Sequence, residues 1–216
     1  MKRREFNLQL GTVGLIAMLG ASLSPLAQAQ GAPREGQEFT RLKEPVAVSG
    51  GGRIEVIEFF GYWCPHCAAF EPVLDAWARK LPADVHFRRM PVAFQAAHEH
   101  YQKLYFGIEA LGAVPALHGK VFTAMHGSRQ RLDKDAEIVA LAAAHGVDGA
   151  KLLDAMKSFS VATKVNQARQ LAQAYHLDGV PTLAVNGRFT TSVTQAGTHE
   201  RALQVVENLI QGARKG

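Results

Sequence analysis

The strongest constraint on the fold is an abrupt change of apolar periodicity at Cys64. Residues 53–60 (RIEVIEFF) carry β-branched and aromatic side chains toward both faces, which is typical of a central, buried strand. Beyond Cys64 the apolar residues recur at three- and four-residue steps, the spacing of one helical face: Cys67, Phe70, Leu74, Trp77 and Leu81. We therefore expect a buried strand to lead into a helix, with the chain's two cysteines at the junction.

The first 29 residues have the three parts of a secretory signal peptide. Lys2, Arg3 and Arg4 form a basic start, residues 10–23 are apolar and uncharged, and Ala27–Ala29 supplies small residues for cleavage. The apolar part is shorter than the roughly 20 residues that span a bilayer. We expect cleavage after Ala29 and export into an oxidising compartment, by the general or the twin-arginine route.

Composition excludes several classes of protein. The 216 residues are 47% hydrophobic and 20% charged, which is ordinary for a globular protein. Two cysteines are too few for a scaffold of several disulfides or for a four-cysteine zinc site. The formal net charge of +5, with no block of like charges, gives no reason to expect binding of nucleic acid or of an anionic membrane.

The middle of the chain is predominantly helical. Short strands are expected at 45–49 and 85–90, followed by several helices across 95–163. Asp133 is expected to cap one of these helices and Asp148 the next, because a short acidic side chain accepts hydrogen bonds from the first free N–H groups.

The C-terminal part predicts a β-hairpin and a helix. Residues 181–185 and 188–193 read as strands joined by Asn186-Gly187, a strong hairpin signal because both residues tolerate positive φ. Thr198 is expected to cap a last amphipathic helix.

Strands at both ends of the mature chain must pair to bury their apolar faces. The sequence therefore predicts an α/β fold in which residues 30–94 and 164–216 form a sheet domain. Residues 95–163 are then an inserted all-helical domain.

Three interpretations of Cys64-Pro65-His66-Cys67 compete. A structural disulfide across a four-residue loop gains only about 2 kcal/mol, against roughly 4.7 kcal/mol for a 100-residue loop. A metal site needs further ligands, and there is no other cysteine, although nine histidines keep soft-metal capture open. A redox-active pair is the third interpretation, and it explains why the motif lies between a strand and a helix.

At a helix N-terminus, backbone N–H groups and the helix dipole favour an anion, so a Cys64 thiolate should be stabilised. A protonated or hydrogen-bonding His66 adds to this effect. Pro65 fits the first turn, where its missing N–H costs nothing, and Cys67 on the apolar face should be shielded. Stabilising the reduced form makes the disulfide a stronger oxidant, by about 30 mV for each pKa unit.

Three motifs, in this order, resemble the DsbA family of periplasmic thiol:disulfide oxidoreductases: Val56–Phe60 (VIEFF), Cys64–Cys67 (CPHC) and Gly179–Thr182 (GVPT). The resemblance covers essentially the whole mature chain. It implies a thioredoxin fold with the helices inserted as a cap. It also implies that Pro181 is cis and faces the disulfide, and that the Val180 backbone pairs with an extended substrate segment.

Glu58 is an acid within an apolar strand. From the strand pattern alone, Glu58 would be a carboxylate that faces solvent or one that pairs with Arg89. The resemblance implies instead a buried group beneath Cys67 that relays protons and whose pKa burial raises. The family often has a lysine near this acid, whereas the aligned residue here is Arg89, which does not give up its proton. Six histidines outside the motif are expected on the surface or at helix caps: His86, His118, His126, His145, His176 and His199.

The resemblance implies an enzyme that donates its Cys64–Cys67 disulfide to newly exported proteins with free thiols. A DsbB-like, quinone-linked membrane oxidase would then reoxidise it. We expect no metal or organic cofactor beyond the cysteine pair, and a monomer. Two alternatives stay open: a disulfide isomerase or reductase of the same fold, and a peptide-holding or soft-metal-binding module in which the cysteines are incidental.

Overall fold

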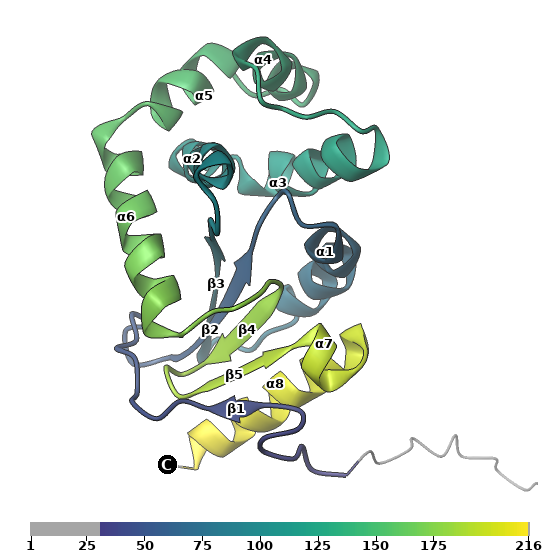
Figure 1. Cartoon of the computed structure of the whole chain (residues 1–216), viewed down its shortest axis with the longest axis vertical. Helices are drawn as coiled ribbons and strands as arrows, with labels where there is room; N and C mark the ends of the chain where they lie inside the picture. Colours follow the sequence, from purple (N-terminus) through teal and green to yellow (C-terminus); the bar gives the residue numbers. More distant parts are fainter. Residues whose placement is uncertain (1–30, 216) are drawn as a thin grey trace, which may run out of the picture. The chain divides into compact units, whose positions relative to one another are not determined.

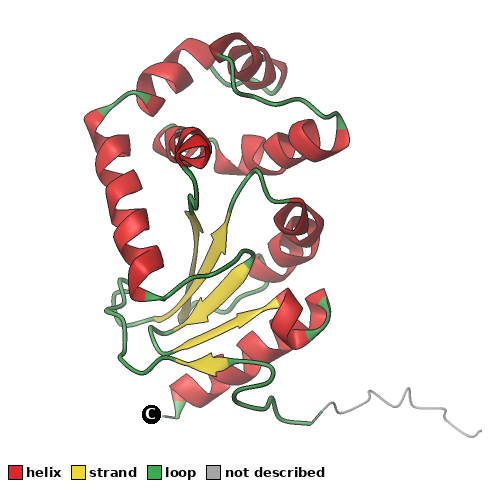
Figure 2. Ribbon diagram, in the orientation of Figure 1, coloured by secondary structure: helices red, strands yellow, loops and turns green. Residues whose placement is uncertain are grey.

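A five-stranded sheet organises the computed structural model, which describes residues 31–215 (Figure 1, Figure 2). The strands found there are β1 Thr40–Arg41, β2 Ile54–Phe60, β3 Val85–Pro91, β4 Thr182–Val185 and β5 Phe189–Ser192. Their spatial order is β1-β5-β4-β2-β3. The predicted signal peptide, residues 1–29, lies outside the described residues.

The sheet is mixed. β2 runs parallel to β3 and antiparallel to β4, and β5 is antiparallel to both β4 and β1. β4 and β5 form the predicted hairpin, in which Asn186 and Gly187 have φ of 50° and 67°. β2 is the central strand that its sequence predicts, since every side chain from Val56 to Phe60 is at most 1% exposed. A sheet interleaved with helices confirms the α/β class.

Helices cover both faces of the sheet (Figure 1). On one face, α1 (Pro65–Ala78) and α8 (His199–Arg214) share an apolar core with β2 and β4. On the other face, the C-terminal part of α6 (Phe159–Ala174) packs through its side chains and through Tyr175, which follows it. The short helix α7 (Val193–Ala196) connects β5 to α8. Because side chains alternate between the two faces along β2, its even-numbered residues, Glu58 among them, point toward α1.

A group of helices lies beyond the ends of β2 and β3 (Figure 1). It consists of η1 Ala96–His98, α2 Glu99–Ala110, α3 Val114–Phe122, η2 Thr123–Gly127, α4 Asp135–Ala144 and α5 Gly149–Met156. Their apolar side chains form one cluster with both cysteines. The domain boundary predicted after residue 163 falls inside α6, which contributes Val165 to this cluster and Leu171 to the sheet core.

The prediction of a strand at 45–49 is wrong. Pro45 has no N–H to donate, and the segment is held instead by a hydrogen bond from Val46 N–H to the Gly187 carbonyl (2.8 Å). The strand that pairs with β5 is the shorter β1.

The predicted helix caps are partly confirmed. Asp148 accepts from Lys151 N–H (3.1 Å) and Thr198 from Arg201 N–H (3.1 Å), as expected. Asp133 caps nothing, because α4 begins two residues later, at Asp135. Within residues 31–215, no helix has the length and hydrophobicity needed to cross a membrane.

Candidate active site

Cys64 occupies the N-cap position of α1. Its backbone is extended (φ −91°, ψ 116°), and its Sγ accepts a hydrogen bond from Cys67 N–H at 3.4 Å. Pro65 is the first helical residue, and His66 is exposed beside it. The sulfur therefore takes the place that a serine or aspartate oxygen has in most caps, facing the free N–H groups of the first turn.

The two sulfurs lie in opposite environments. Both are free thiols; Cys64 is 3% exposed and Cys67 is 0% exposed. A hydrogen bond from the Cys67 thiol, the backbone N–H groups of Cys67 and His66, and the charge of His66 together lower the pKa of Cys64 to about 6, against the opposing effect of burial. Burial raises the pKa of Cys67 far above its usual range, and the negative charges of Cys64 and Glu58 raise it further.

A loop distant in sequence reaches the first cysteine. The Val180–Pro181 peptide is cis, as the resemblance implies, and the Val180 carbonyl oxygen lies 3.4 Å from Cys64 Sγ, where the thiol can donate to it. Thr182 Oγ1 donates to the Gly179 carbonyl (2.8 Å) and closes the loop. Among the described residues, no group accepts a hydrogen bond from Val180 N–H.

Glu58 is buried, and the register of β2 and β3 places Arg89 beside it. It lies opposite Arg89 on β3, with 3.2 Å between Glu58 Oε2 and Arg89 Nε. Burial, followed by the charge of Glu71, raises the pKa of Glu58 to about 8, and Arg89 offsets only part of this. The buried carboxyl is therefore the protonated form near neutral pH.

Two buried polar residues were missed by sequence reasoning. Glu71 on α1 accepts from Arg89 Nη2 (2.8 Å). His118 on α3 was expected on the surface, which is wrong: it is buried, with its Nδ1 2.8 Å from the Tyr62 hydroxyl. Each had a signal in the sequence. Glu71 follows Cys67 by four residues and so shares its helix face, and His118 precedes the apolar Val121 by three.

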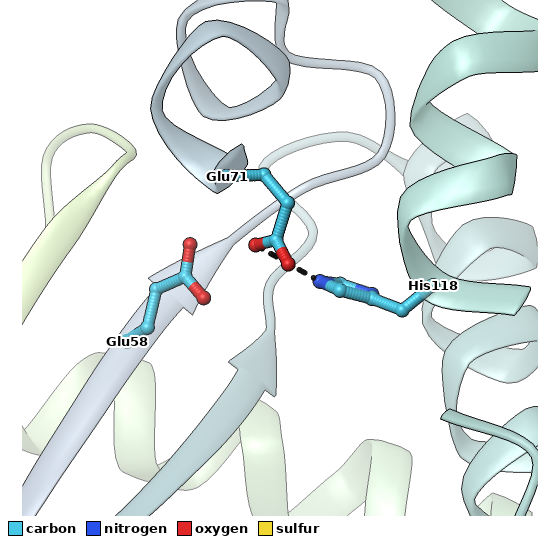
Figure 3. Close-up of side chains that lie close together, drawn as sticks. All are labelled: Glu58, Glu71 and His118. Carbon is cyan, nitrogen blue, oxygen red and sulfur yellow. Dashed lines mark ion pairs between the residues drawn. The ribbon is translucent and has the colours of Figure 1, made fainter. Parts of the chain in front are cut away.

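One group within residues 31–215 has the spacing of a metal site. It comprises Glu58, Glu71 and His118, whose ligand atoms all lie within 4.8 Å of one another (Figure 3). The three side chains point toward one another from β2, α1 and α3 (Figure 3). Neither cysteine belongs to this group.

Comparison with known proteins gives a consistent answer. Residues 55–204 match the family described as the DSBA-like thioredoxin domain. The chain belongs to this DsbA-like family. It is 46% identical over 202 residues to the thiol:disulfide interchange protein DsbA of Bordetella pertussis, covering 92% of this chain and 94% of that protein. It is 39% identical over 201 residues to DsbA of Pseudomonas aeruginosa, covering 93% and 95%.

The solved structures agree with the sequence relatives. The crystal structure of Pseudomonas aeruginosa DsbA matches with a TM-score of 0.81 at 38% identity, covering 85% of this chain and 95% of that chain. The oxidoreductase DsbA from Xylella fastidiosa matches with a TM-score of 0.79 at 27% identity, covering 86% and 100%. The predicted thioredoxin fold with helices inserted into it is thereby confirmed.

Membership of the DsbA family also establishes the activity. The chain is a thiol:disulfide oxidoreductase of the disulfide-donating kind, which acts through the redox-active pair Cys64 and Cys67. DsbA relatives are periplasmic bacterial proteins that interact with substrate proteins and with a redox partner. Arg89 is the cation beside Glu58, and because a guanidinium keeps its proton, Arg89 does not carry a mobile proton there.

Proposed function

We propose that this DsbA-like chain oxidises the thiols of newly exported proteins in the periplasm by transferring its Cys64–Cys67 disulfide to them. One observation carries the proposal: the pKa of Cys64 is lowered to about 6, whereas burial raises that of Cys67. A thiolate about three pKa units more acidic than the ordinary value of 9.0 favours the reduced form by about 4 kcal/mol. In a two-electron couple this raises the reduction potential by about 90 mV.

The transfer takes two exchange steps. A substrate thiolate attacks Cys64 Sγ, the Cys64–Cys67 bond breaks, and Cys67 leaves with the electron pair and takes up a proton. A second substrate thiolate then attacks the substrate sulfur of the mixed disulfide. Cys64 leaves as the stabilised thiolate, and the substrate departs with its new disulfide. The substrate is oxidised by two electrons, and the cysteine pair is reduced by the same two.

Each residue around the sulfurs has a proposed role. His66 and the first helical turn, which Pro65 opens, stabilise the Cys64 thiolate. Glu58 supplies the proton to Cys67, whose burial disfavours its anion. The support is that burial raises the pKa of Glu58 to about 8, so that it holds a proton near neutral pH, and that Glu58 lies close enough to Cys67 for its ionised form to raise the pKa of that thiol.

The Val180–Pro181 loop is proposed as the docking site for the substrate. The Val180 carbonyl lies beside Cys64 Sγ, and no described group accepts from the Val180 N–H. An extended substrate segment can therefore pair with this backbone by strand addition, which places its cysteine next to the attacked sulfur.

We further propose how the protein is delivered and recycled. Residues 1–29 act as a signal peptide cleaved after Ala29, and the mature monomer folds as a sheet domain, 30–94 with 164–216, carrying the helical domain 95–163. A DsbB-like membrane oxidase linked to quinone restores the disulfide, because a donor must lose its electrons before it can act again.

The Cys64→Ser variant tests the assignment. Oxidation of a reduced, unfolded substrate protein should be abolished, whereas a peptide-holding function would survive. Cys67→Ser should accumulate a mixed disulfide when it is mixed with an oxidised substrate, because the Cys64 thiolate attacks the substrate disulfide, a substrate thiolate leaves, and no Cys67 thiol remains to release the bound chain.

The reduction potential of the wild type, measured by equilibration with glutathione, distinguishes a disulfide donor from a reductase or isomerase of the same fold. We expect a potential well above that of a reducing thioredoxin. A potential near the thioredoxin value would support the reductase or isomerase alternative, and thiol oxidation by Cys64→Ser would refute the proposed mechanism.

A further inference from the structure

Three side chains from separate elements converge behind α1. Glu58 on β2, Glu71 on α1 and His118 on α3 are 0%, 6% and 2% exposed, and their ligand atoms lie within 4.8 Å of one another (Figure 3). The packing of the helical segment against the sheet creates this group, because no two of its members are close in sequence.

The atoms that face one another lack hydrogen bonds among the described residues. These atoms are both oxygens of Glu58, Oε2 of Glu71 and Nε2 of His118. Glu71 Oε2 and His118 Nε2 are 3.2 Å apart without hydrogen-bond geometry. Two ligands of a tetrahedral ion with bonds of about 2.1 Å are separated by roughly 3.4 Å, so this pair already forms one edge of such a site. Buried polar atoms rarely stay unpartnered, and a shared cation would satisfy one oxygen of Glu58, Oε2 of Glu71 and Nε2 of His118, while Arg89 lies 3.2 Å from the Oε2 of Glu58.

The formal charges also favour a divalent cation. Arg89 forms ion pairs with Glu58 (3.2 Å), Glu71 (2.8 Å) and Asp75 (3.5 Å). Three carboxylates against one guanidinium give the fully ionised set a formal charge of −2, which a divalent ion neutralises. Arg89 contacts Oε2 of Glu58 and Oε1 of Glu71, so one oxygen of each carboxylate remains for an ion.

His118 has a hydrogen-bond partner on its second ring nitrogen, as metal-binding histidines commonly do. Its Nδ1 lies 2.8 Å from the hydroxyl of Tyr62, which is itself buried. Metal-binding histidines commonly donate their other ring N–H to a neighbouring oxygen, which fixes the tautomer and turns the free lone pair toward the metal. Here that arrangement presents Nε2 to Glu71.

An open cavity borders the group on the side of Glu71 and His118. It has a volume of about 980 Å³, lies between α1 and α3, and is lined by Glu71, Arg89 and His118 among others. Neither cysteine lines this cavity, so an ion that entered the group from it would not pass the sulfurs.

We propose that Glu58, Glu71 and His118 form a binding site for a divalent first-row transition ion, for which Zn²⁺ is the fitting probe. One imidazole nitrogen and two carboxylate oxygens suit such an ion. A bound ion holds Glu58 as a carboxylate, which opposes departure of the Cys67 thiolate. That consequence rests on the proposed function, whereas the binding itself does not.

Co²⁺ binding to the mature Cys64→Ser, Cys67→Ser protein tests the site without competing thiolates. We expect the intense visible absorption of a four- or five-coordinate ion, displaced by Zn²⁺. Tyr62→Phe should weaken binding on the order of tenfold, as loss of an outer contact does. Glu71→Gln and His118→Gln remove ligands and should weaken it further. His126→Gln is the matched control, because His126 lines the same cavity but its Nε2 lies 2.7 Å from the Tyr62 carbonyl and it is not one of the three proposed ligands, so this variant should bind normally.

A second measurement does not depend on how the ligand variants fold. Long-range ¹H–¹⁵N spectra of the same cysteine-free protein should show Zn²⁺ shifting Nε2 of His118 while its Nδ1 stays protonated. Unchanged His118 signals, absorption of six-coordinate Co²⁺ alone, or equal losses in His126→Gln and His118→Gln would overturn the proposal. A protein without this site can still oxidise thiols, so the two proposals fail separately.

Discussion

At the scale of single residues, Cys64 combines two roles that are usually separate. As the N-cap of α1 it accepts the hydrogen bond of Cys67 N–H, which an uncapped helix would leave unsatisfied. The same donors stabilise the thiolate. The atom that begins the helix is therefore also the reactive atom, and its acidity follows from the geometry of the helix terminus together with the neighbouring Cys67 thiol.

Replacing His66 with Ala should raise the pKa of Cys64. The larger contribution of the Cys67 thiol remains in this variant, while the charge of His66 is lost. Because the charge of His66 is the smallest of these contributions, we expect a rise of less than about one pKa unit and a potential lower by less than about 30 mV. Thiolate absorbance in the ultraviolet, followed against pH, measures the change. His145→Ala, exposed at the end of α4, is the control; a titration curve identical to wild type in His66→Ala would remove His66 from the mechanism.

Sequence reasoning places the residues whose roles are local and misses those that depend on packing. Cys64 and Cys67 follow from periodicity and helix-end chemistry, and Glu58 from its position in an apolar strand. Glu71 and His118 meet only because α3 packs against α1, two elements between which β3, η1 and α2 lie in the sequence. No local sequence pattern predicts the contact between them, although both residues lie on apolar helix faces.

At the scale of elements, the β4–β5 hairpin also fixes the segment before β2. Gly187 has φ of 67°, and its carbonyl accepts from Val46 N–H, so the turn holds the chain that crosses it. A Cβ at Gly187 would overlap the Val46 carbonyl oxygen. The glycine is therefore needed twice, for its positive φ and for this close approach.

Gly187→Ala should destabilise the protein by at least about 2 kcal/mol, because it combines a strained φ with a backbone clash. Gly212→Ala is a matched control within α8, where an added Cβ meets nothing within 4 Å. It should stabilise by about 0.5–1 kcal/mol through helix propensity. Urea unfolding of both variants measures the difference. Equal effects of the two substitutions would contradict the role given to the turn.

Elements with a strong local signal are predicted well. The hairpin follows from Asn186-Gly187, and the caps of α5 and α8 from Asp148 and Thr198. The segment 45–49 shows the limit of this approach. Its apolar residues suit a strand, but whether an extended segment joins a sheet depends on a partner far along the chain.

At the scale of the whole molecule, oxidation state and stability are linked. The pKa of Cys64 is about 6 in the folded reduced form, against an ordinary value of 9.0 for an unfolded thiol. Folding therefore gains free energy from the thiolate, and the disulfide form has no such gain. The reduced protein should be the more stable one, and this difference drives transfer of the disulfide.

The excess stability of the reduced form should vary with pH in a defined window. Because the folded pKa is depressed, the contribution is complete above about pH 9.0, falls by about 1.4 kcal/mol for each pH unit below it, and vanishes below about pH 6. Denaturant titrations of the reduced and oxidised forms at several pH values measure it. The cysteine-free protein should unfold identically in reducing and oxidising buffer. A difference that stays constant across the window would contradict the linkage.

The short outer strand β1 has a consequence for a protein that exchanges disulfides with other chains. Unpaired strand edges are templates on which other chains add and aggregate. One border of this sheet is only Thr40–Arg41, and the other, β3, carries Arg88 and Arg89 and ends in Pro91. A very short edge strand, and an edge strand with charged side chains and a proline, offer few backbone groups to which another chain could add as a further strand. Contact with a substrate chain should therefore not extend this sheet by a further strand at either border.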